Sequence, residues 1–97
     1  MKSLDSGRGE KMLVKNAFVR KGKIGNQVFL INGRQCFELN EIGVFIWEAF
    51  DSPISIEDVI DRVANEFEIS TEERNSVEKD IRNYINNLLE FELVYEE

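Results

Sequence analysis

The sequence predicts a single α+β domain in which a three-stranded antiparallel sheet precedes three helices. The hydrophobic pattern carries this prediction. Between Leu13 and Leu39 apolar residues alternate with a period of about two, as in strands, and after Leu39 the period becomes about 3.6, as in helices. A length of 97 residues, 42% of them hydrophobic and only one of them Pro, fits one small domain with one core and leaves no room for two.

Three strands are expected before the period changes. An imperfect alternation predicts the first strand over residues 13–20. Residues 27–31 and 35–39 are rich in β-branched and aromatic side chains and flank Asn32-Gly33, a pair that suits a type I′ turn, so they predict a hairpin. Residues 21–26 then form the looser connection between the first two strands.

Three helices are expected next, each behind an Asn or Ser at the N-cap position. The first is apolar almost all round, which places it in the core together with its Phe45 and Trp47. Gly43 within this helix indicates close packing against the sheet. The N-caps and expected helices are Asn40 with 41–50, Ser55 with 56–67, and Ser70 with 71–91.

The two ends of the chain have different patterns. Residues 1–12 are mostly polar and contain two Gly, so we expect a flexible N-terminal arm ahead of a domain over residues 13–97. Residues 92–97 alternate enough to predict a short edge strand.

Catalytic and metal-binding groups are sparse. The chain has no His and a single Cys, Cys36, which excludes a Cys/His zinc site, a Ser-His-Asp or Cys-His catalytic group and an intrachain disulfide. The sequence also lacks a Gly-rich phosphate loop. We therefore expect a protein that is not an enzyme and holds no metal or cofactor. The lone Cys, the absence of an apolar run near the ~18 residues of a membrane span and a start without a signal peptide's apolar region predict a cytoplasmic protein with no membrane partner.

Strands followed by helices, with a short segment between the last two helices, are the layout of a winged helix-turn-helix-like domain. A nucleic-acid-binding or transcription-associated role is therefore the alternative function. The net charge of −7 and the acidic last helix argue against it, because duplex binding depends on Lys and Arg contacts to phosphates. Residues 1–36 carry eight Lys and Arg against two acids, while residues 37–97 carry four against seventeen, a contrast that serves solubility or steers a charged partner.

One run combines a strand end, a helix cap, a Gly and a Trp. Residues 39–51 read LNEIGVFIWEAFD and resemble the LNEVGAxIWELLDG signature of the PqqD family. These proteins are stand-alone recognition elements for the precursors of ribosomally synthesised and post-translationally modified peptides (RiPPs). The likeness covers residues 14–95, because Val28-Phe29-Leu30 precedes the signature at the family's spacing, residues 55–60 resemble its TVEEIV helix, and residues 67–94 resemble its third helix followed by GLV.

The resemblance implies a peptide-binding module. In the family, the leader segment of a precursor adds as an antiparallel strand beside the third strand, in the cleft between that strand and the third helix. The leader is then presented to a maturation enzyme such as a radical-SAM protein, a cyclase or a leader peptidase. The Ile-Trp-Glu in the signature favours a pathway other than that of pyrroloquinoline quinone, for instance a lasso peptide or another radical-SAM-modified peptide. Glu92 stands where the family usually has the Gly that ends the third helix.

The predicted site joins the third strand to the third helix. That strand ends the expected sheet, so its unpaired backbone groups can accept a leader strand, and the same edge permits pairing of two copies as a homodimer. On the helix, polar residues are expected to contact the leader, whereas the apolar stripe suits the core by pattern and a groove wall by resemblance. The predicted peptide-binding residues are Gln35, Cys36, Phe37, Glu38 and Leu39 on the strand, polar Lys79, Arg82 and Tyr84, and apolar Val77, Ile81, Ile85 and Leu88.

Overall fold

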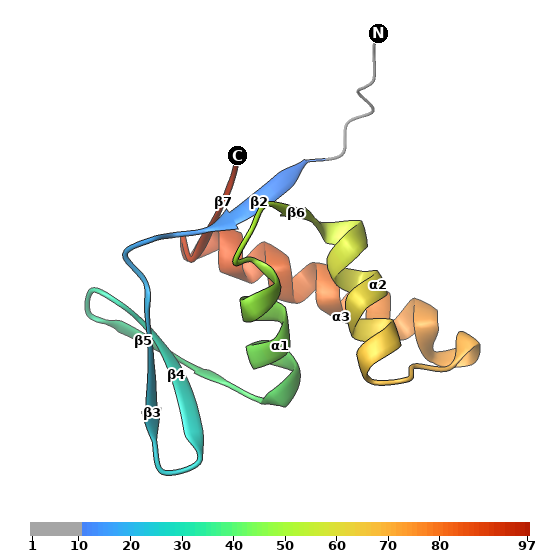
Figure 1. Cartoon of the computed structure of the whole chain (residues 1–97), viewed down its shortest axis with the longest axis horizontal. Coiled ribbons are helices and arrows are strands. Elements are labelled where there is room, and N and C mark those ends of the chain that lie inside the picture. The colour runs from blue at the N-terminus through green and yellow to red at the C-terminus, as the bar shows by residue number, and fades with distance from the viewer. Residues whose placement is uncertain (1–10) are drawn as a thin grey trace, which may run out of the picture.

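The computed structural model describes residues 11–97, which form two small antiparallel sheets and three helices (Figure 1). The α+β class and the three-stranded antiparallel sheet combined with three helices are confirmed. The expected arm over residues 1–12 lies outside the described residues except for its last two. Of these, Met12 already begins a strand.

The larger sheet is a meander of three strands, β3 (Arg20–Ile24), β4 (Gln27–Asn32) and β5 (Gln35–Leu39), in the order β3-β4-β5. The predicted hairpin of the last two strands is confirmed. Two-residue loops join the strands, and Gly25 and Gly33 open these loops with φ of 61° and 63°. Only Gly adopts this left-handed conformation without steric cost, so both tight turns depend on a Gly.

The expected type I′ turn at Asn32-Gly33 is wrong by one residue. Asn32 pairs with Gln35, so the loop residues are Gly33 and Arg34. Gly33 has a positive φ and Arg34 does not. Gly at the first loop position is the pattern of a type II′ turn, and Asn32 therefore ends the strand instead of entering the turn.

The expected first strand over residues 13–20 is confirmed only for residues 13–15. The chain leaves extended structure after Lys15 and re-enters it at Arg20, and the predicted connection over residues 21–26 supplies β3 and its turn. Most of β3 is exposed, and it is held by backbone pairing to β4, so it lacks the apolar alternation that would have marked it. Gly25-Asn26 was the available signal, because a Gly-Asn pair between two strands is typical of a two-residue hairpin.

The smaller sheet gathers distant parts of the chain. Its central strand β2 (Met12–Lys15) pairs with β6 (Ile54–Ser55) on one side and with β7 (Val94–Glu96) on the other, both antiparallel. The predicted C-terminal edge strand is thus confirmed as β7. Asn16, buried just after β2, donates from its side chain to the Glu92 carbonyl at 2.8 Å and ties this sheet to the end of the last helix.

The three helices are α1 (Glu41–Ala49), α2 (Ile56–Glu66) and α3 (Thr71–Glu90). Each ends one residue earlier than expected. The predicted N-caps are confirmed, since each cap side chain accepts a backbone N–H three residues on, at 2.7 to 3.2 Å. The cap pairs are Asn40 with Gly43, Ser55 with Asp58, and Ser70 with Glu73.

Both α2 and α3 are followed, two residues after their last helical residue, by a Glu with left-handed backbone conformation. Glu68 and Glu92 have φ of 52° and 61°. The following amides close the end of each helix, with Ile69 N donating to the Ala64 carbonyl at 3.0 Å and Leu93 N to the Leu88 carbonyl at 2.8 Å. The end of α3 is therefore the one the PqqD pattern predicts, although Glu replaces the usual Gly.

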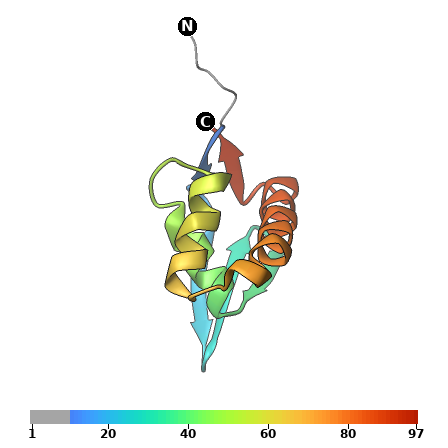
Figure 2. The same ribbon diagram turned by 90° about the vertical axis from the view of Figure 1, so that its right-hand side faces the viewer.

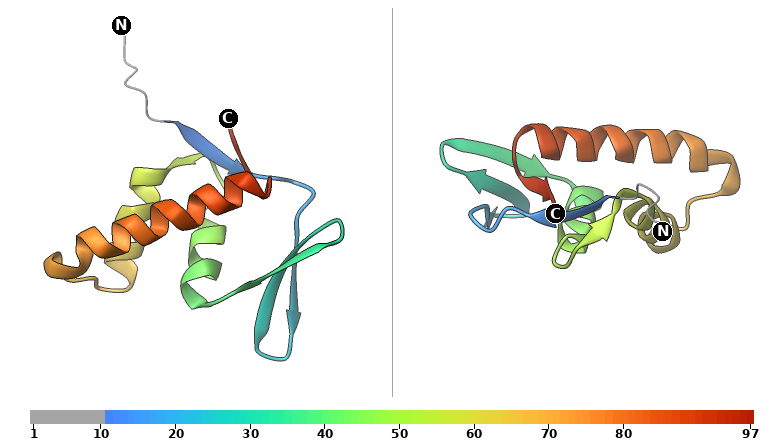
Figure 3. Two further views of the ribbon diagram at one scale, coloured as in Figure 1. Left: turned by 180° about the vertical axis from the view of Figure 1, so that it is seen from behind. Right: turned by 90° about the horizontal axis from the view of Figure 1, so that it is seen from above.

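The core lies between the helices and the two sheets. Seen from the side, α2 and α3 stand next to each other (Figure 2), and seen from behind, α3 runs across α1 and α2 (Figure 3). Trp47 is buried as predicted, while Phe45 is half-buried and packs edge-on against Phe67 with ring centroids 5.5 Å apart. No helix within residues 11–97 is long and apolar enough to cross a membrane.

Candidate binding groove

β5 is an edge strand, and its register shows which backbone groups are free. A two-residue loop closes on a hydrogen-bonded pair, here Asn32 and Gln35, and hydrogen-bonded and non-bonded pairs then alternate along an antiparallel ladder. The N–H and C=O groups of Gln35, Phe37 and Leu39 therefore point to β4. Those of Cys36 and Glu38 point outward, which gives the open edge two donors and two acceptors for an added strand.

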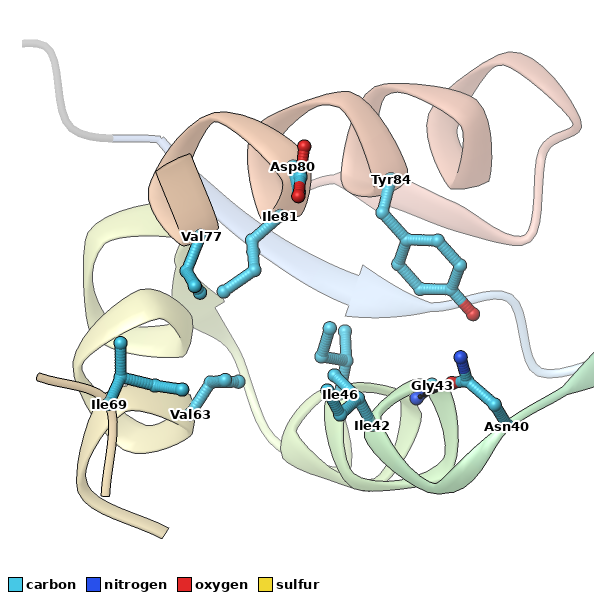
Figure 4. Close-up of a pocket in the computed structure, with 10 residues that line it drawn as sticks. All are labelled: Asn40, Ile42, Gly43, Ile46, Val63, Ile69, Val77, Asp80, Ile81 and Tyr84. Carbon is cyan, nitrogen blue, oxygen red and sulfur yellow. Dashed lines mark hydrogen bonds between the residues drawn. The ribbon is translucent and has the colours of Figure 1, made fainter. Parts of the chain in front are cut away.

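A groove of about 260 Å³ lies beside this edge, between α1 and α3 (Figure 4). Its lining is mostly aliphatic, with one carboxylate, one amide and one phenol. The α1–α3 groove is lined by Asn40, Ile42, Gly43, Ile46, Val63, Ile69, Val77, Asp80, Ile81 and Tyr84. Such a lining, apolar with few polar groups, suits an apolar side chain of a ligand.

A second hollow of about 210 Å³ connects the groove to the strand. This β5 hollow is lined by Glu38, Asn40 and Tyr84. Asn40 and Tyr84 line both spaces. One surface therefore runs from the end of β5, past the N-terminus of α1, to the loop between α2 and α3.

Tyr84 stands where the two spaces meet, and Gly43 makes room for it. A Cβ on Gly43 would lie 2.8 Å from the Tyr84 Oη, closer than real Cβ atoms approach. Figure 4 shows the phenol reaching from α3 toward Asn40 and Gly43. Burial raises the pKa of the Tyr84 phenol above its ordinary value, so the hydroxyl keeps its proton and can donate a hydrogen bond. The expected close packing at Gly43 therefore involves α3 as well as the sheet, where a Leu39 methyl group would lie 3.4 Å from the same Cβ.

Sequence comparison identifies the family. The model of coenzyme PQQ synthesis protein D (PqqD) matches residues 27–94, more than half of the chain. This chain belongs to the PqqD family. No protein of curated function matches it by sequence.

The fold of this PqqD-family chain is similar to that of TbiB1, whose structure is described as a complex with the TbiA(beta) leader peptide. The TM-score is 0.66 at 24% identity, and the match covers 84% of this chain and 93% of the TbiB1 chain. At this identity the likeness shows a shared fold. It extends beyond the residues that the family model matches, since 84% of the chain includes part of the segment before β4.

The α3 residues predicted for the PqqD-type site divide into three groups. Val77, Ile81 and Tyr84 line the α1–α3 groove. Ile85 and Leu88, which are 0% and 5% exposed, are part of the hydrophobic core. Lys79 and Arg82 line a shallow hollow on another face of α3, with Asn75, Glu78, Asn83 and Asn86.

Arg82 is fully engaged on that other face. Its guanidinium pairs with Glu57 of α2 and with Glu78 one turn earlier on α3, the latter at 3.0 Å. Hydrogen bonds to these carboxylates raise the pKa of Arg82 above its ordinary value. The structure thus does not bring Arg82 or Lys79 to the predicted cleft, because at 100° per residue these positions point away from Tyr84 and Ile81.

The β5 residues also take distinct places. Gln35, Cys36 and Glu38 are exposed, Leu39 is buried, and Phe37 is half-buried against Phe91 with ring centroids 5.0 Å apart. This contact joins β5 to the residue that follows α3. The free Cys36 thiol is exposed beside the open edge.

Several groove residues escaped the sequence prediction: Asn40, Ile42, Gly43, Ile46, Val63, Ile69 and Asp80. Asn40 and Gly43 had been given helix-capping and packing roles, which they keep. The sequence offered no signal that set them apart, because Ile42, which is 39% exposed, is as apolar as the buried residues of α1. Within residues 11–97, no group of three or more His, Cys, Asp or Glu side chains is placed to hold a metal ion.

Proposed function

We propose that this PqqD-family chain binds the leader segment of a ribosomally made precursor peptide by adding it as a strand to β5. The observation that carries the proposal is the juxtaposition of the open β5 edge with the apolar α1–α3 groove. Strand addition supplies affinity through backbone hydrogen bonds, and pockets for side chains supply specificity. The description of TbiB1 as bound to a leader peptide supports the same role.

An antiparallel leader strand on β5 would have a defined direction. β5 runs from Gln35 to Leu39, so an antiparallel strand begins opposite Leu39 and leaves near Gln35. Leu39 is followed by Asn40, which lines both the β5 hollow and the α1–α3 groove. A leader residue at or just before the paired stretch therefore reaches the groove. The outward groups of Cys36 and Glu38 then hold the residues that follow.

We infer that the chain itself is an adaptor and not an enzyme, and that it presents the bound leader to a maturation enzyme. A radical-SAM protein, a cyclase or a leader peptidase would each serve, and a lasso peptide or another radical-SAM-modified peptide stays our expected product. We expect the leader to be presented to that enzyme in the cytoplasm, because the chain uses a single Cys. The free β5 edge also supports a homodimer, which would compete with the leader for the same backbone groups.

The nucleic-acid alternative finds little support on α3. Of its three basic residues, Arg74 pairs with Asp61 and Arg82 with Glu57 and Glu78. Lys79 is the remaining cation, beside acids such as Glu78 and Asp80. A helix so neutralised offers few contacts for phosphates.

The test selects peptides from a random displayed library on the immobilised full chain. The tightest selected peptide, the probe peptide, is then titrated into isotope-labelled protein. We expect amide shifts to concentrate at Cys36, Glu38 and the groove residues of α3. Cys36→Pro should weaken binding of the probe peptide at least tenfold, about 1.4 kcal/mol, because Pro removes an outward N–H.

Cys36→Ser is the matched control, since it keeps that N–H and should bind as wild type does. Circular dichroism establishes that each variant is folded. Phe37→Pro serves as a contrast, because the Phe37 N–H points to β4 and its loss should destabilise the sheet itself. Equal binding by folded Cys36→Pro, or shifts confined to another surface, would exclude strand addition at β5.

A further inference from the structure

The α1–α3 groove and the adjoining β5 hollow contain one carboxylate each and no cation. Asp80 lines the α1–α3 groove and Glu38 lines the β5 hollow, on either side of Tyr84. Neither carboxylate takes part in an ion pair with any residue of the described chain, 11–97. The other lining residues are uncharged. The wall that faces a ligand is therefore apolar in its centre and negative at its rim.

Several acids elsewhere on the described chain are neutralised. On the other face of α3, Glu78 pairs with Arg82 at 3.0 Å, and on α2 Asp61 pairs with Arg74 at 2.5 Å. Lys21 of β3 pairs with Glu48 of α1 at 2.9 Å. Lys21, Arg74 and Arg82 are thus engaged, and Lys79 lies on another face of α3. Glu38 and Asp80 are among the acids without an ion pair in the described chain, and both line the surface where the ligand is proposed to bind.

We infer that the groove selects a leader segment in which an apolar side chain is flanked by Lys or Arg. This inference rests on the proposed function and names the chemistry of the peptide. The apolar side chain enters between Ile42, Ile81 and Tyr84. A neighbouring cation on the leader meets Glu38 or Asp80, which a leader strand on β5 would pass in turn.

The sign of the charge decides between classes of peptide. A leader with Asp or Glu at these positions would bring like charges together in a half-enclosed site, which costs affinity, whereas a cation gains both contact energy and a faster encounter. Exposed ion pairs are individually weak, so the expected preference for a cation is only roughly three- to tenfold when both pairs form.

The experiment repeats the peptide selection on three proteins: wild type, the double variant Glu38→Gln/Asp80→Asn, and the control Glu96→Gln/Glu97→Gln. The control removes the same charge from β7 and the residue after it, in the other sheet. Wild type and control should enrich peptides with Lys or Arg beside an apolar residue. The double variant should enrich the apolar residue without the cation.

The probe peptide selected on wild type gives the quantitative arm. Its affinity for the double variant should be roughly three- to tenfold lower than for wild type. Added salt should lower its affinity for wild type, and much less so for the double variant. If wild type enriches apolar strand-forming peptides with no cation, or with Asp or Glu, this inference is wrong and the proposed function stands. If no peptide is enriched, or the enriched peptides bind equally to folded Cys36→Pro, both are wrong.

Discussion

The two faces of α3 differ in the number of their charged residues and in what those residues contact. On the far face, Arg82 joins Glu78 of its own helix to Glu57 of α2, and Arg74 reaches Asp61. On the groove face, Asp80 has no such partner among the described residues, and the side chains around it are apolar. The far face is neutral and closed by ion pairs, whereas the groove face is open and negative.

The difference comes from what packs against each face. α2 presents carboxylates to the arginines of α3, so the charges cancel across the helix pair. The N-terminal turn of α1 presents Asn40, Ile42 and Gly43 instead, and Gly43 gives up side-chain volume to admit Tyr84. A helix face becomes a binding surface where its neighbour neither fills it nor neutralises it. The four predictions below test that contrast.

The largest expected effect removes the support that both faces share. Trp47 is buried in α1, with the Lys15 ammonium 4.9 Å from its ring. Trp47→Ala should lower the free energy of unfolding by roughly 3 to 5 kcal/mol, a large part of the ~5 to 15 kcal/mol of a small domain. Urea unfolding followed by circular dichroism measures the loss. Near wild-type stability would show that α1 is not the central helix.

The next effect separates the two faces directly. Tyr84→Ala removes the side chain at the junction of the α1–α3 groove and the β5 hollow. It should weaken binding of the probe peptide at least tenfold, about 1.4 kcal/mol. Arg82→Ala breaks only ion pairs that are largely exposed, each of which contributes ~0 to 1 kcal/mol, so its affinity should stay within about twofold of wild type. Calorimetry on the two folded variants decides. A larger loss of peptide affinity in Arg82→Ala than in Tyr84→Ala would mean that the binding site lies on the far face of α3.

Sequence reasoning reached the helices, their caps and the β4–β5 hairpin because those signals are local. Asn40 and Ser70 act within three residues of themselves, and Gly33 sets its own turn. It missed β3, which is held by pairing with β4 and not by burial. The pairing within the second sheet was also not predicted, although its strand β7 was, because a two-residue strand such as Ile54–Ser55 has no pattern of its own.

The candidate site was half predictable for the same reason. The PqqD-like signature located the edge strand and the stripe of α3, but a stripe at helical spacing does not say which neighbour covers it. Ile85 and Leu88 belong to the core, whereas Lys79 and Arg82 lie on another face, and this division depends on how α1 and α2 pack against α3. The contact of Gly43 with Tyr84 joins residues that are far apart in sequence, and no local rule predicts it.

A smaller effect tests the contact between Gly43 and Tyr84. The effect of Gly43→Ala on stability should change from unfavourable to neutral or favourable when the Tyr84 hydroxyl is removed. Gly43→Ala places a Cβ 2.8 Å from the Tyr84 Oη, so the phenol must shift and both stability and probe-peptide affinity should fall. In a Tyr84→Phe background the hydroxyl is gone, and Ala gains up to ~1 kcal/mol over Gly in a helix interior. The same substitution should then be near neutral or stabilising. Unfolding free energies of the four proteins give the coupling, and additive effects would mean that Gly43 is not there to admit Tyr84.

The smallest expected effect comes from substitutions just beyond the ends of α3 and α2, which leave both faces of α3 unchanged. Glu92 holds a left-handed φ of 61° just beyond the helix, where a side chain is strained, so Glu92→Gly should raise the free energy of unfolding by ~0.5 to 1 kcal/mol. Glu92→Gln keeps the strain while removing the same charge, and it should gain little. Glu68→Gly at the end of α2, where φ is 52°, should stabilise similarly. Because neither residue lines the groove, the affinity for the probe peptide should stay at the wild-type value in all three variants. A change in affinity that accompanies the gain in stability would mean that the end of α3 is coupled to the groove, and the two faces could then no longer be treated as independent.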